Sequence, residues 1–174
     1  MDQKKFINIT IFIVIIVIIV GVTGYFLMNS NLSPAQTQTE PIQSDTITYT
    51  NNQYGFNFVL PSSWKGYSIV STNWQGNMID TLNQTIRGPE ILIRHPLWSV
   101  LSPRQDIPIM IFTLDQWNLI QAEKLSVSAA PIPPSEFGRN ANYVFALPAR
   151  YNFAYPTGYE EVDQIIQGKP LHTF

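Results

Sequence analysis

The longest apolar run in the chain lies near its amino end, where residues 6–28 read FINITIFIVIIVIIVGVTGYFLM without a charged residue. As a helix this run would be about 35 Å long, enough to cross a hydrocarbon core of about 30 Å. In lipid the backbone must satisfy its own hydrogen bonds, and a single span does so only as a helix. The pattern therefore predicts one transmembrane helix over Phe6–Met28.

Beyond residue 46 the apolar positions alternate in short segments. Tyr54, Phe56, Phe58 and Leu60 fall on one face of the segment YGFNFVL, which is typical of a half-buried strand. Other segments predicted to be strands are Ile47–Thr50, Tyr67–Trp74, Glu90–Arg94 and Asn142–Leu147. The polar residues around Gln75–Asn77 predict a loop, and Leu171–Phe174 is either a last short strand or a loosely docked tail.

One segment, Ile107–Leu114, is apolar on both faces, so we expect a central strand covered on both sides, with Pro108 at its start. Two helices are expected after it. Asp115 is a suitable cap for the first, and Thr157–Glu160 matches a capping box for the second, which Gly168 ends. Because strands dominate, the fold class is α+β, with a central, mainly antiparallel sheet packed by helices.

The stretch YGFNFVLPSSW, with Gly55, Phe56, Phe58, Pro61 and Trp64, resembles the opening of PsbP-like domains, the superfamily of the extrinsic oxygen-evolving subunit of photosystem II. The chain as a whole is similar to single-pass membrane proteins of bacteria. The resemblance implies an α/β/α sandwich and a fold used for protein docking. It carries no catalytic residue over to this sequence.

The pattern divides the chain into four parts: residues 1–5, the span at 6–28, a polar linker at 29–46 and a domain at 47–174. The linker is rich in Asn, Ser, Thr, Gln and Pro, a composition typical of a flexible tether. Lys4 and Lys5 precede the span, and the next basic residue is Lys65. The positive-inside rule therefore predicts a single-pass protein of the cytoplasmic membrane, with a cytoplasmic amino end and the domain outside. The alternative is a cleaved signal peptide, which has a shorter apolar core of about 7–15 residues.

Composition removes several classes of function. Charged residues make up 13% of the chain, about half the usual share of roughly 25%. Beyond the span there are eight Lys and Arg against eleven Asp and Glu, so we expect no nucleic-acid partner, which needs a clustered basic face. The absence of cysteine excludes disulfides, thiol catalysis and cysteine-based zinc sites.

His95 is the main candidate for catalysis. With Asp106 or Asp80 and a serine it could form a hydrolytic triad, although no G-x-S-x-G motif marks the nucleophile. The alternative role, which we favour, is a hydrogen-bonded residue at a strand end. The acidic residues Glu160, Glu161 and Asp163 fit the amino end of a helix better than a metal site, and we expect no metal and no cofactor.

Aromatic residues concentrate between Tyr143 and Tyr159. They are either core residues or part of a recognition surface, because Tyr and Arg are favoured at protein interfaces. The residues proposed for such a surface are Arg150, Tyr151, Tyr155, Trp74 and Trp98.

The sequence therefore favours a membrane-anchored, non-enzymatic domain that binds a protein or an envelope component. The alternatives are an extracytoplasmic hydrolase that uses His95 and a structural subunit of a membrane complex.

Overall fold

The computed structural model describes residues 45–80, 84–127 and 132–174. The predicted transmembrane span, the preceding residues and nearly all of the linker lie outside these ranges. Among the residues that are described, no helix is both long enough and apolar enough to cross a membrane.

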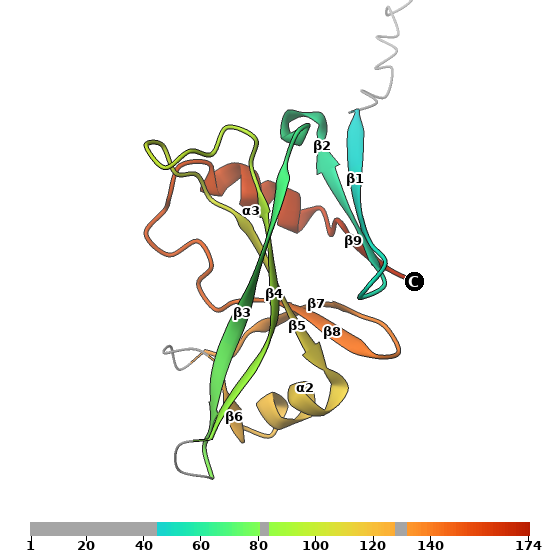
Figure 1. The fold of residues 1–174 in the computed structure, drawn as a ribbon, viewed down its shortest axis with the longest axis vertical. Coiled ribbons are helices and arrows are strands. Elements are labelled where there is room, and N and C mark those ends of the chain that lie inside the picture. The colour runs from blue at the N-terminus through green and yellow to red at the C-terminus, as the bar shows by residue number, and fades with distance from the viewer. Residues whose placement is uncertain (1–44, 81–83, 128–131) are drawn as a thin grey trace, which may run out of the picture. The chain divides into compact units, whose positions relative to one another are not determined.

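The described part contains nine strands, one 3-10 turn and two α-helices (Figure 1). The strands are β1 (Thr46–Asn51), β2 (Phe56–Pro61), β3 (Ser68–Met78), β4 (Thr85–Arg94), β5 (Ile107–Thr113), β6 (Leu125–Ser126), β7 (Ser135–Arg139), β8 (Tyr143–Leu147) and β9 (Leu171–Thr173). The 3-10 turn is η1 (Ser62–Trp64), and the helices are α2 (Leu114–Gln121) and α3 (Tyr159–Gln167).

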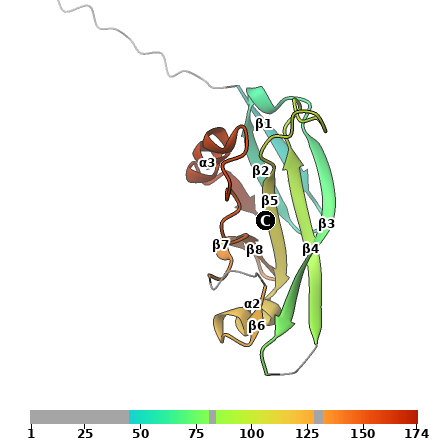
Figure 2. The same cartoon turned by 90° about the vertical axis from the view of Figure 1, so that its left-hand side faces the viewer.

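The strands form two sheets, of order β1-β2-β9 and β6-β3-β4-β5-β8-β7. Every strand pair in the described residues is antiparallel. The larger sheet is strongly twisted, as the turned view shows (Figure 2). The α+β class with a mainly antiparallel sheet is therefore confirmed, and the second, three-stranded sheet is a feature that the sequence pattern did not predict.

Strand β5 is central and covered on both faces, as its apolar sequence predicted. Ile107, Ile109 and Ile111 enter a core with Phe56, Phe58 and Leu60 of β2 and Val162 of α3. Met110 and Phe112 enter a second core with Trp117 and Ile120 of α2. One face is therefore covered by the smaller sheet and α3, and the other by α2.

Several local predictions were wrong. The polar residues after Trp74 do not form a loop, because β3 continues to Met78 and pairs with β4 from Ser68 to Asn77. Strand β4 begins at Thr85 rather than Glu90, and β7 was not predicted.

The helix caps also differ from prediction. Thr113 caps α2 in a capping box with Gln116, and Asp115 lies in the first turn. The N-cap of α3 is Gly158 in the left-handed conformation, with no side-chain cap. The helical periodicity predicted both helices correctly. The N-cap residue of each helix depends on the backbone conformation just before the helix, which the periodicity does not contain.

Candidate functional site

His95 lies at the end of β4 and is only 5% exposed. The Leu97 backbone N–H donates to His95 Nδ1 at 3.0 Å, and the Trp64 ring meets the imidazole edge to face at 5.0 Å. Burial lowers the pKa of His95 below its usual value, and the nearby Arg104 guanidinium lowers it further, whereas Glu161 acts in the opposite direction. The imidazole is therefore a neutral, packed side chain that fixes the start of the β4–β5 loop.

The neighbours of His95 are not arranged as a triad. Ser63 Oγ donates to Glu161 Oε1 at 2.8 Å, and Glu161 Oε2 lies 3.9 Å from His95 Nε2. The carboxylate therefore lies between the serine and the histidine, whereas a triad needs the histidine between the other two. Asp106, one of the acids considered, binds Arg94 through both carboxylate oxygens. This geometry gives no support to His95 as a general base.

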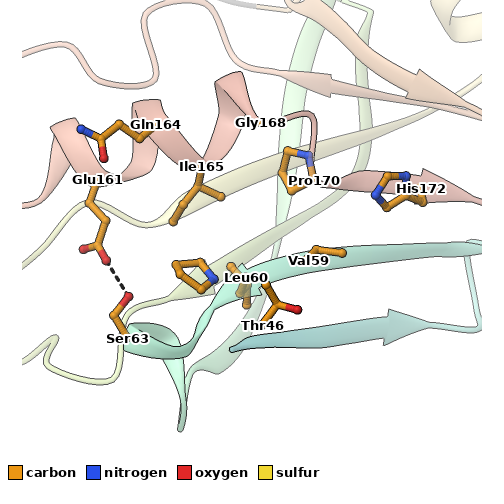
Figure 3. A pocket seen from close by; sticks show the side chains of 11 residues that line it. Thr46, Val59, Leu60, Ser63, Glu161, Gln164, Ile165, Gly168, Pro170 and His172 are labelled. Carbon is orange, nitrogen blue, oxygen red and sulfur yellow. Dashed lines mark hydrogen bonds between the residues drawn. The ribbon is translucent and has the colours of Figure 1, made fainter. Parts of the chain in front are cut away.

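A groove with a volume of about 540 Å³ runs between α3 and β2 (Figure 3). The Ser63–Glu161 hydrogen bond crosses one end, and Pro170 and His172 of the following segment line the other. His95 is not among its lining residues. In the residues that the structure describes, no three His, Asp or Glu side chains are grouped so that they could hold a metal ion.

Trp74 was proposed for the binding surface, but it is only 3% exposed and belongs to the second core. Its indole N–H donates to the Ile111 carbonyl at 2.8 Å, and its ring packs against Phe112 at 4.5 Å. It has no accessible face for a partner. Trp98, the other tryptophan proposed, is half-buried beneath the Arg94 guanidinium, which lies 3.9 Å from its ring centroid.

The other three proposed residues lie together in the segment between β8 and α3. We call residues 150–155 of this segment the Arg150–Tyr155 loop. Tyr151 holds it to α3, because its hydroxyl donates to Asp163 Oδ1 at 2.6 Å and the Asn152 amide donates to the same carboxylate. Burial, with a further contribution from Asp163, raises the pKa of Tyr151 well above its usual value. Tyr151 therefore acts as a fixed structural contact.

The rest of this loop is exposed and held in an unusual backbone conformation. Arg150, Ala154 and Tyr155 have φ values of 55°, 76° and 48°. For residues other than glycine, left-handed conformations cost about 1–3 kcal/mol each and concentrate at functional sites. Phe153 and Tyr155 are 74% and 72% exposed, and the Tyr155 ring also contacts Tyr159 at 5.0 Å.

The structure also exposes apolar residues that are not among the five proposed for binding: Leu97, Val100 and Leu101 in the β4–β5 loop and Phe153 beside Tyr155. The β4–β5 loop meets the chain just after the Arg150–Tyr155 loop, where the Gln105 backbone N–H donates to the Thr157 carbonyl at 2.9 Å. The sequence signal for the first loop was its apolar residues between Pro96 and Pro103, a region where turns are normally polar.

Comparisons with known protein families, with curated proteins and with solved structures found no match for this chain. The candidate site is therefore defined by its own geometry: a fixed loop that presents Phe153 and Tyr155 to solvent.

Proposed function

We propose that this chain is a non-enzymatic binding domain, anchored by the span at Phe6–Met28 outside the cytoplasmic membrane, which docks a protein partner through the Arg150–Tyr155 loop. The observation that carries the proposal is the exposure of Phe153 and Tyr155 on a backbone in costly left-handed conformations. Aromatic side chains are frequent anchors at protein interfaces, and a loop already fixed in shape loses little entropy on binding.

The kinship with PsbP-like domains is part of this proposal. A helix covers each face of β5, α2 on one side and α3 on the other, as in an α/β/α sandwich, and the three-stranded sheet that lies with α3 is an addition to that arrangement. The Tyr151–Asp163 bond fixes the loop to one of the covering helices. The proposed docking surface is therefore held in place by α3, which packs on the core.

A photo-crosslinking residue at position 155 of the full chain, expressed in its native membranes, tests the proposal. We expect a discrete crosslinked species that is lost when Phe153→Ser is added, because both aromatic residues contact the partner. Ile79 is the matched control position, since it is 59% exposed at the end of the β3–β4 hairpin that lies far from α3. Recovery of the monomer alone, or the same species from both positions, would contradict the proposal.

A further inference from the structure

The loop between β4 and β5 presents two aliphatic side chains almost entirely to solvent: Val100 is 83% and Leu101 97% exposed. Turns in soluble proteins favour Gly, Pro, Asn, Asp and Ser, because their backbones and side chains suit the turn conformation, so aliphatic residues at these positions need another explanation. Leu97 in the same loop is 70% exposed. Three exposed apolar residues in one short loop form a cluster of the kind that is frequent at interaction sites.

This tip is an ordered turn. The backbone N–H of Ser99 donates to the Ser102 carbonyl, and the backbone N–H of Ser102 donates to the Ser99 carbonyl, at 3.2 and 3.1 Å. The Ser99 hydroxyl accepts a further bond from the Ser102 N–H at 3.0 Å. The serines thus satisfy their own backbone groups, and the Ser99–Ser102 turn projects Val100 and Leu101 from its end.

Aromatic and basic groups lie behind the aliphatic tip. Trp98 is half-buried and stacked on Arg94, whose charge is paired with Asp106. Arg104 follows the turn and lies 3.8 Å from Glu161 of α3, and no acidic residue occurs between His95 and Gln105. In a bilayer, aliphatic side chains favour the lipid interior, tryptophan favours the interface and arginine keeps its charge near water. The residues of this loop follow the same order, from the aliphatic tip through Trp98 to the arginines.

The chain also enters the domain at the same end as this turn. Thr46, the first residue of β1, pairs with Pro61, which leads into η1, and Trp64 of η1 packs on His95 at the base of the β4–β5 loop. Both views place the start of β1 and the β4–β5 loop at one end of the domain (Figures 1 and 2). The sequence predicts a flexible linker over residues 29–46, and a flexible chain of that length would reach about 20–25 Å.

We infer that the Ser99–Ser102 turn inserts Val100 and Leu101 into the surface of the bilayer to which the chain is anchored, so that the domain rests on the membrane with its β1 end towards the lipid. This inference rests on the proposed membrane anchor. It is independent of the partner proposed for the Arg150–Tyr155 loop.

Because the chain lacks cysteine, a single fluorophore can be placed at either end of the domain. We would label Leu101→Cys and, as the control, Ile79→Cys in the full chain with an environment-sensitive dye. Both side chains are exposed, so neither change disturbs the core. Each protein is reconstituted into phosphatidylcholine–phosphatidylglycerol vesicles, with and without brominated acyl chains, and its co-flotation with the vesicles is measured.

We expect the dye at position 101 to shift its emission to the blue and to be quenched by brominated lipid, whereas the dye at position 79 does neither. If the chain floats with the vesicles but the dye at 101 stays in water, the inference is wrong and the anchor stands. If the chain does not float, both are wrong. The same labelled proteins are also measured in native membranes. If the dye at 101 is shielded there but not in pure lipid, the turn binds a protein, which also contradicts the inference.

Discussion

At the scale of single residues, polar side chains in this domain hold loops in place. His95 accepts the Leu97 N–H, Tyr151 donates to Asp163, and the Asn140 side-chain amide donates to the carbonyls of Tyr54 and Gly55. Each bond joins a loop to a strand end or a helix. Histidine and aspartate are also common catalytic residues, which explains why His95 was a candidate from the sequence. Its contacts in the fold are those of a structural residue.

The burial of His95 predicts that the stability of the fold depends on pH. Its pKa in the folded protein lies below its value of about 6.5 in the unfolded chain, so the unfolded state binds the proton first as pH falls. Stability should therefore be unaffected above about pH 7 and should decrease below about pH 6.5, down to the folded pKa. The measurement is the free energy of unfolding by denaturant between pH 7.5 and pH 5.

The variant His95→Asn keeps an acceptor near the position of Nδ1 but cannot titrate. We expect a smaller loss of stability on acidification than in the natural protein, where the slope is at most about 1.4 kcal/mol per pH unit for one proton. Replacing the exposed His172 by Asn is the control for losing a histidine. Equal slopes in the natural protein and His95→Asn would show that His95 does not couple to folding.

At the scale of elements, the β3–β4 hairpin shows where sequence patterns were insufficient. Asn73, Gln75 and Asn77 suggested a loop, but β3 lies near the edge of the sheet and these side chains point to solvent, while Trp74 and Gly76 are buried between them. Pairing with β4 decides the conformation of such a segment, and local composition does not contain that information. The apolar strand β5 was predicted because both of its faces are buried.

Gly88 in β4 is required by Trp74 in β3, its partner across the ladder. A Cβ atom at position 88 would clash with the indole ring, so in Gly88→Ala the Trp74 side chain or the strand backbone must shift. We expect a loss of about 1–3 kcal/mol of stability, the usual cost of overpacking. Thermal or denaturant unfolding measures it.

The control is a double-mutant cycle with Trp74→Phe. If the clash with the indole causes the loss, Gly88→Ala should cost less in the Trp74→Phe background than alone. A cost that is the same in both backgrounds would mean that Gly88 is needed for another reason.

At the scale of the whole molecule, the sequence predicted the fold class, the central strand and both helices, because these depend on periodic burial. It did not predict how loops distant in the chain come together. The place of Trp74 in the second core depends on contacts with Ile111 and Phe112, which are more than thirty residues away in sequence. The apolar residues between Pro96 and Pro103 were a signal in the sequence, but only the structure shows that Val100 and Leu101 are exposed at a turn.

The central claim is that the described domain lies outside the cytoplasmic membrane, held by the span at Phe6–Met28. A single cysteine tests it directly, because the natural chain has none. Lys169 is exposed in the domain, so Lys169→Cys reports the side of the membrane on which the domain lies. Asp2→Cys reports the side on which the amino end lies. With a membrane-impermeant thiol reagent we expect labelling of position 169 in intact cells, and of position 2 only after lysis. Labelling of position 169 only after lysis would contradict the claim.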